Sequence, residues 1–248
     1  MIKRWIHSFF MTWGMFFAIF CPFPRWDERA RGNMMVCLPL IGGIVGGLWA
    51  LCAWLLGLAS LPAPITALIL AALPWLVTGF LHLDGFMDVC DAVLSRRDLE
   101  TRQKILKDSH CGAFAVICMG LLMLAQWSVF FSGTPRLLPL ALIPVATRAC
   151  AGLAVLLLRP LGTSQYAGLA PSGKAAKVTP LLLMLLASVI LPAVLCGGQG
   201  CAPLAAAIMY WLAVWYGFRQ LDGMSGDISG FALTLGELAG AAVLILVR

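Results

Sequence analysis

Three aspartates in a largely apolar chain have the spacing that a helix needs to bring carboxylates together. Asp84, Asp88 and Asp91 stand in "HLDGFMDVCDA" at positions i, i+4 and i+7, which return to one face of a helix. Carboxylates this close repel one another unless a cation lies among them, and oxygen ligands of this kind suit Mg²⁺ with phosphate oxygens and water. We therefore expect these three aspartates to hold magnesium, and Gly85 to leave room for a substrate or metal. His82 is a candidate ligand, base or phosphate contact, or an ordinary interfacial histidine.

A second polar cluster, "KDSHCG", follows the aspartates and directly precedes another apolar stretch. Backbone amides at the start of the next helix favour an anion, and a cation, a hydroxyl and an imidazole stand beside them. A diphosphate requires a metal on one side and cationic groups on the other. The candidate phosphate contacts are therefore Lys107, Ser109 and His110, together with Arg102 a little earlier in the chain.

Two more segments could serve the same chemistry. In "RQLDGMSGDISG", Asp222 and Asp227 could hold a second metal or orient an attacking hydroxyl, or the segment is only a Gly-rich turn. Asp91, Asp227 and His82 are the candidates for direct participation in catalysis, for example as a base. Residues 159–179 are rich in Gly and Ser and form either a plain connector or a mobile flap over a nucleotide.

The composition places these polar clusters in a membrane protein. Of the 248 residues, 61% are hydrophobic and only 11% are charged, and the mean hydropathy is +0.94. Ordinary globular domains carry about 25% charged residues, so most of the surface must face lipid. The net charge of +6 comes from short segments between apolar runs rather than from one basic face. That pattern excludes a nucleic-acid partner and suits a polytopic protein with basic cytoplasmic segments.

We expect an all-α bundle with about seven transmembrane helices, since each span needs about 20 apolar residues. Residues 3–20 are expected to be retained as an interfacial or half-inserted helix, and no second domain is expected within residues 1–248. The glycines of "IGGIVGG" are interpreted as a face for close helix packing. The predicted spans are 34–58, 61–81, 112–131, 137–158, 180–196, 203–217 and 231–247.

The order of the spans assigns the polar clusters to one side of the membrane. Segments 21–33, 82–111, 159–179 and 218–230 fall on the same side and hold 12 of the 17 basic residues. Basic residues collect in cytoplasmic segments. We therefore expect an integral protein of a bacterial cytoplasmic (inner) membrane with its active site on the cytoplasmic side.

Three ordered motifs carry a family resemblance. "HLDGFMDVCDA", then "ILKDSHCGAFAV", then "GMSGDISGFALTLGE" resemble the adenosylcobinamide-GDP ribazoletransferase (cobalamin synthase) family, as do "CPFPRW" and "PLIGGIVGG" nearer the N-terminus. The sequence departs from the family pattern at Ala92, His110 and Ser225, where Gly, Arg and Thr are usual. His is mostly neutral at neutral pH, which weakens the interpretation of His110 as a permanent phosphate contact.

The resemblance implies a magnesium-dependent membrane enzyme of coenzyme B12 synthesis. Such an enzyme joins adenosylcobinamide-GDP to α-ribazole or its 5′-phosphate, with release of GMP. Two alternatives remain: a CDP-alcohol phosphotransferase that makes a phospholipid, and a transporter or channel with an acidic ion site. The sequence leaves open whether the protein forms a homo-oligomer.

Overall fold

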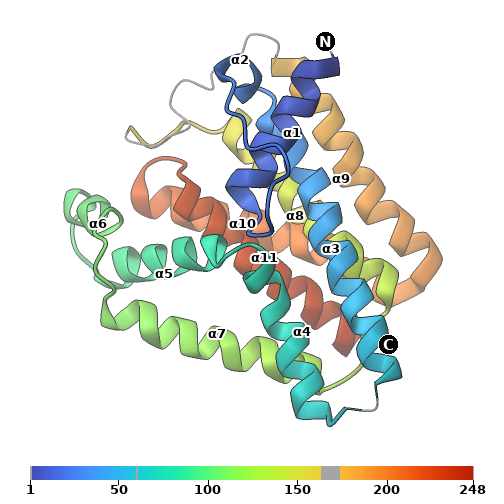
Figure 1. Cartoon of the computed structure of the whole chain (residues 1–248). Coiled ribbons are helices and arrows are strands. Elements are labelled where there is room, and N and C mark those ends of the chain that lie inside the picture. The colour runs from blue at the N-terminus through green and yellow to red at the C-terminus, as the bar shows by residue number, and fades with distance from the viewer. Residues whose placement is uncertain (1, 60, 163–173, 248) are drawn as a thin grey trace.

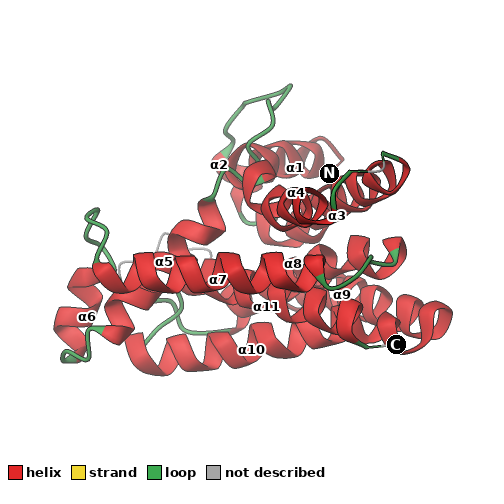
Figure 2. Cartoon of the chain, turned by 90° about the horizontal axis from the view of Figure 1, so that it is seen from below, coloured by secondary structure: helices red, strands yellow, loops and turns green. Residues whose placement is uncertain are grey.

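The computed structural model describes residues 2–59, 61–162 and 174–247, and within these residues the regular secondary structure is helical (Figures 1 and 2). The predicted all-α class is confirmed. Most of the proposed flap at 159–179 lies outside the described residues. The elements are α1 (Ile2–Phe16), α2 (Glu28–Arg31), α3 (Met34–Leu58), α4 (Ala63–Val77), α5 (Leu81–Leu94), α6 (Leu99–Ile105), α7 (Ala113–Phe131), α8 (Leu137–Leu157), α9 (Lys174–Cys196), η1 (Gly197–Cys201), α10 (Ala202–Leu221) and α11 (Gly226–Leu246).

Five helical stretches of the described chain are long and apolar enough to cross a membrane, and a sixth is added if α4 and α5 form one broken span. One stretch, Ala175–Leu221, has 47 residues and includes η1. At 1.5 Å per residue it would measure about 70 Å, roughly twice the hydrocarbon thickness of a bilayer. It contains both of the spans predicted at 180–196 and 203–217. A polytopic membrane bundle is therefore confirmed, whereas the count of seven spans stays a prediction.

Small residues let α3 and α8 pack closely, as the "IGGIVGG" motif predicts. A Cβ atom at Gly42 would lie 2.4 Å from the carbonyl oxygen of Pro144, and one at Gly46 would lie 1.9 Å from that of Ala141. Neither position can hold a side chain without moving a backbone. A Cβ at Gly47, in contrast, would meet nothing within 4 Å. The packing interpretation is therefore confirmed for Gly42 and Gly46 but not for Gly47.

The second predicted span is broken. Helix α4 ends at Val77, and α5 leaves it at an angle of 91° (Figure 1). Gly79 (φ +61°) and Phe80 (φ +62°) both adopt the left-handed conformation, and the Thr78 hydroxyl donates to the carbonyl of Pro74 at 2.8 Å. Two successive left-handed residues turn the chain sharply. The aspartates therefore stand on a separate helix, α5, which packs against α11 and α7.

The basic segments meet at one end of the molecule. The turn before α11 pairs with the chain that follows α8, since Leu161 N donates to Met224 O and Met224 N donates to Arg159 O, each at 2.8 Å. Gln103 of α6 donates to the carbonyl of Leu221 at 2.7 Å. A Cβ at Gly32, just after α2, would lie 3.2 Å from Lys177 Nζ in α9. All four segments predicted to share one side are thus represented in these contacts.

Helix α1 is too short to cross a bilayer. Its 15 residues measure about 22 Å, and it packs beside α3. The buried hydroxyls of Ser8 and Thr12 donate to the carbonyls of Ala30 and Met34, at 2.8 and 3.2 Å. The end of α1 therefore has a fixed place beside the bundle, where its last residues can form part of a wall.

Candidate active site

A cavity of about 370 Å³ lies where α1, α3, α5, α8 and α11 approach one another. Apolar side chains form most of its wall, and seven polar or charged groups interrupt them. Apolar walls with a few placed polar groups are typical of small-molecule sites. The polar lining consists of His82, Asp84, Lys107, Arg148, Ser225, Asp227 and Ser229.

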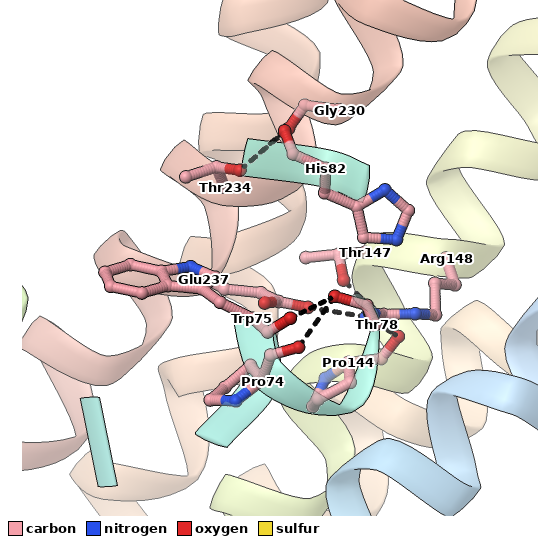
Figure 3. Close-up of polar contacts among 10 residues, drawn as sticks. All are labelled: Pro74, Trp75, Thr78, His82, Pro144, Thr147, Arg148, Gly230, Thr234 and Glu237. Atoms are coloured by element: carbon pink, nitrogen blue, oxygen red, sulfur yellow. Dashed lines mark hydrogen bonds and ion pairs between the residues drawn. The ribbon is translucent and has the colours of Figure 1, made fainter. Parts of the chain in front are cut away.

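Glycines bring α5 and α11 together at this cavity. A Cβ at Gly85 would lie 2.8 Å from Asp227 Cα, and a Cβ at Gly230 would lie 2.8 Å from the carbonyl oxygen of His82. The Thr234 hydroxyl also contacts the His82 carbonyl at 3.3 Å (Figure 3). The expectation that Gly85 makes room for a substrate or metal is therefore wrong, because the room is filled by α11. The close crossing instead places the carboxylates of two helices side by side.

Two carboxylates line the cavity, one from each of these helices. Asp84 is exposed on the first turn of α5, and Asp227 is half-buried on the first turn of α11. Ser225 caps α11 by accepting from Ile228 N at 3.2 Å, and its hydroxyl contacts Asp227 Oδ2 at 3.3 Å. Asp88 lies one turn further along α5, within the electrostatic reach of both.

Asp91 lies on the same face of α5, but its carboxylate accepts hydrogen bonds from another helix. Its Oδ2 accepts from Gly112 N at 2.5 Å and its Oδ1 accepts from Ala115 N at 2.9 Å, at the start of α7. Gly112 is the N-cap of α7 and has no side chain of its own to cap it. A Cβ there would lie 2.5 Å from both Asp91 oxygens. The two carboxylate oxygens of Asp91 are thus used as a helix cap.

The "KDSHCG" segment divides between the cavity and solvent. Lys107 lines the cavity, whereas Ser109 and His110 are exposed and do not. His110 Nδ1 lies 2.6 Å from Asp108 Oδ1. The hydrogen bond to Asp108 and its negative charge raise the pKa of His110, and the same hydrogen bond lowers the pKa of Asp108. His110 therefore pairs locally instead of reaching the cavity.

Arg102 and Asp222 are also absent from the cavity wall. Arg102 Nη1 donates to Gln220 Oε1 in α10, which ties α6 to the bundle. Asp222, the left-handed residue that ends α10, forms an exposed ion pair with Arg159 at 2.5 Å. Of the predicted site residues, the structure thus brings His82, Asp84, Lys107 and Asp227 to one cavity, with Asp88 close behind.

A buried ion pair at this cavity was missed from the sequence. Arg148 of α8 and Glu237 of α11 are 1% and 4% exposed, and their Nη1 and Oε1 atoms lie 2.5 Å apart (Figure 3). His82 is 8% exposed, and its ring stacks against Phe16 with 6.4 Å between centroids. A charged residue inside an apolar span is a signal for function, and Arg148 in "PVATRACAG" carries that signal.

The carboxylates at the cavity fit a magnesium ion whose remaining ligands are substrate oxygens and water. Among the described residues, no three His, Cys, Asp or Glu side chains are arranged to hold an ion by themselves. Magnesium, however, is commonly held by one or two carboxylates, with substrate phosphates and water completing the octahedron. Asp84 and Asp227, facing one cavity from two helices, match that smaller requirement.

Fold and cavity together define a polytopic helical membrane protein with a polar site of carboxylates and cationic groups. Comparison with known proteins narrows this class, because residues 8–245 match the family described as cobalamin-5-phosphate synthase. The chain belongs to this family.

Three relatives named adenosylcobinamide-GDP ribazoletransferase illustrate the similarity. The protein of Clostridium perfringens (strain 13 / Type A) is 37% identical over 239 residues, which cover 94% of this chain and 95% of the relative. That of Clostridium botulinum (strain Alaska E43 / Type E3) is 35% identical, covering 96% and 97%. That of Halalkalibacterium halodurans is 36% identical, covering 86% and 85%. No solved structure matches the chain.

Proposed function

We propose that the protein is an adenosylcobinamide-GDP ribazoletransferase. It transfers the adenosylcobinamide phosphate moiety of adenosylcobinamide-GDP to α-ribazole or its 5′-phosphate, releases GMP, and forms adenosylcobalamin or its 5′-phosphate. The observation that carries this proposal is the family match over residues 8–245, which include every residue that lines the cavity. The relatives with this printed name cover nearly the whole chain. The phospholipid-synthase alternative is not favoured by this family membership.

The metal in this proposal is Mg²⁺, held by Asp84 and Asp227 with Asp88 in support. When bound, the ion would neutralise charge on the diphosphate and make its phosphorus more electrophilic. Three mutually repelling carboxylates beside a polar cavity support this assignment. Asp91 and Asp222 do not hold the metal in this proposal, because their oxygens accept from α7 amides and from Arg159.

The protein side chains orient the reacting groups. Lys107, on the cavity wall, would contact phosphate oxygens and stabilise the charge that develops on departing GMP. The acceptor hydroxyl oxygen forms a bond to the cobinamide-bearing phosphorus while the bond from that phosphorus to the bridging oxygen of GMP breaks. The hydroxyl proton passes to His82, whose Nε2 has no partner among the described residues, or to a carboxylate free of metal.

The proposed setting is a bacterial cytoplasmic membrane, with the cavity open towards the cytoplasm. Support comes from the apolar helices and from the basic segments that meet at the end of the bundle beside Asp227 and Lys107. Basic residues favour the cytoplasmic face.

The direct test uses the detergent-solubilised full chain with adenosylcobinamide-GDP, α-ribazole 5′-phosphate and Mg²⁺, and measures GMP. We expect GMP and adenosylcobalamin 5′-phosphate in equal amounts, and no GMP when EDTA is present. A folded protein that releases no GMP but forms CMP from a CDP-lipid and an alcohol would overturn the proposal in favour of a phospholipid synthase. Release of neither nucleotide would favour transport.

A further inference from the structure

The buried guanidinium of Arg148 has donors that the protein leaves unused. Its Nη1 contacts Glu237 Oε1 at 2.5 Å and the carbonyl of Pro144 at 3.4 Å. Its Nε and Nη2 have no hydrogen-bond partner in the part of the chain that the structure describes. A buried donor without a partner is costly, and here two of them belong to one charged group that is only 1% exposed.

These donors belong to a group on the wall of the cavity. Arg148 lines the same cavity as Asp84, Asp227 and Lys107, and so does His82, whose Nε2 also has no partner among the described residues. Figure 3 shows the His82 ring next to the Arg148 side chain. Asp84 and Lys107 are exposed, whereas Arg148 and His82 are buried, so Arg148 and His82 form the inner end of the cavity wall.

The free edge of the guanidinium fits one kind of ligand best. Nε–H and Nη2–H form a planar fork that matches two oxygens of a phosphate or carboxylate. Glu237 occupies the other side of the guanidinium through Nη1 and fixes its orientation. Gly42 adds to this fixed position, because a Cβ there would lie 3.0 Å from Arg148 Cδ.

We propose that the Nε–Nη2 edge of Arg148 binds a phosphate oxyanion of a substrate at the inner end of the cavity. This inference rests on the proposed function, whose substrates carry phosphates. Arg148 is then a binding residue, and Glu237 is a positioning residue that acts through it. The oxyanion belongs either to the 5′-phosphate of the acceptor or to the diphosphate of adenosylcobinamide-GDP.

The kinetic test compares Arg148→Lys, which keeps the charge and loses the fork, with Arg136→Lys as a matched control. Arg136 is the N-cap of the same helix and contacts the carbonyl of Cys196 outside the cavity. If the acceptor supplies the oxyanion, Arg148→Lys raises KM at least tenfold for α-ribazole 5′-phosphate and leaves KM for α-ribazole unchanged. If the donor supplies it, KM for adenosylcobinamide-GDP rises with either acceptor. Arg136→Lys leaves all three constants within twofold.

A binding test separates this inference from the proposed activity. Thermal unfolding of the full chain is followed with added inorganic phosphate or pyrophosphate, without magnesium. We expect phosphate or pyrophosphate to raise the unfolding temperature of the wild type and of Arg136→Lys. Arg148→Lys should need at least a tenfold higher concentration of the same anion for an equal rise in unfolding temperature. If Arg148→Lys weakens anion binding but the wild-type protein releases no GMP, the anion site is supported and the proposed function is contradicted. Folded Arg148→Lys with wild-type probe binding and unchanged KM values would overturn the inference alone.

Glu237→Gln provides a second variant if Arg148→Lys does not fold. It keeps a hydrogen-bond acceptor for Arg148 and removes the charge that neutralises the guanidinium. The cavity then gains one net positive charge, so we expect pyrophosphate to bind more tightly than to the wild type. Equal or weaker binding by a folded Glu237→Gln protein would contradict the proposal.

Discussion

Asp84, Asp88 and Asp91 share one face of α5 but have three different surroundings. Asp84 faces the cavity, Asp88 lies within reach of its neighbours' charges, and Asp91 accepts from two amides of α7. A regular stripe of carboxylates therefore combines a site for a cation with a contact that holds the next helix in place. The two roles predict different results when single residues are changed.

Removal of the cavity carboxylates should strongly reduce turnover without loss of the fold. We expect Asp84→Asn and Asp227→Asn to lower the rate of GMP release by about 100-fold or more, because each change removes negative charge that would hold the metal. Part of the Asp84→Asn loss should be recovered at high Mg²⁺. Glu100→Gln is the matched control, since Glu100 forms only an exposed pair with Lys104, and it should retain wild-type turnover. Wild-type rates for both cavity variants would exclude the metal site.

Asp91→Ala should act on stability rather than on chemistry. It leaves Gly112 N and Ala115 N without their acceptor, and loss of a helix cap costs about 0.5–2 kcal/mol. We expect a lower midpoint of thermal unfolding in detergent, and a turnover per folded molecule close to that of the wild type below that midpoint. Loss of turnover with an unchanged unfolding midpoint would instead support Asp91 as a metal ligand.

At the scale of residues, types and spacing are local properties, so the sequence could single out His82, Asp84, Lys107 and Asp227, which the structure brings to one cavity; their roles stay predictions. The sequence could not separate Asp84 from Asp91, because both occupy one helical face and only the packing of α7 distinguishes them. Asp222 and Asp227 differ for a similar reason: Asp222 is the C-cap of α10, whereas Asp227 lies in the first turn of α11. Arg148, in contrast, could have been found, since a charge within an apolar span is visible without any structure.

At the scale of elements, helix contacts decide where the site lies. Hydropathy measures how apolar a segment is, but it does not show where a helix axis changes direction. The apolar residues before Asp84 were therefore predicted as one span. The 91° bend depends on two left-handed residues, one of which is Phe80 rather than glycine. A left-handed phenylalanine is rare and becomes visible only in the folded chain.

Adjacent glycines of α3 offer a matched test of the packing. We expect Gly46→Ala to destabilise the protein by about 1–3 kcal/mol, because its Cβ would overlap the backbone of α8. Gly47→Ala meets open space and should be neutral or stabilising by up to about 1 kcal/mol. Thermal unfolding of the two variants in the same detergent provides the comparison, and equal midpoints would contradict the close contact of α3 with α8.

At the scale of the whole molecule, two native cysteines test the orientation. Cys111 is exposed between α6 and α7, and Cys201 is exposed in η1 between α9 and α10. The test uses two variants, one that keeps Cys111 as its single cysteine and one that keeps Cys201. A membrane-impermeant maleimide should label Cys111 only in inside-out vesicles and Cys201 only in right-side-out vesicles. Labelling of both from the same side would contradict the proposed topology, and detergent-solubilised samples provide the control for reactivity.

The pair of Arg148 and Glu237 also bears on how the protein is made. Translation proceeds from the N-terminus, so α8 is synthesised with a buried cation 89 residues before its counter-charge in α11 exists. A lone charge at the centre of a helix costs about 2.5–3.5 kcal/mol on insertion into the bilayer. Insertion of α8 carries this cost until α11 supplies Glu237. Biogenesis of the cavity thus ends with the last helix, and a chain truncated before Glu237 would present quality-control proteases with an unpaired arginine in the membrane.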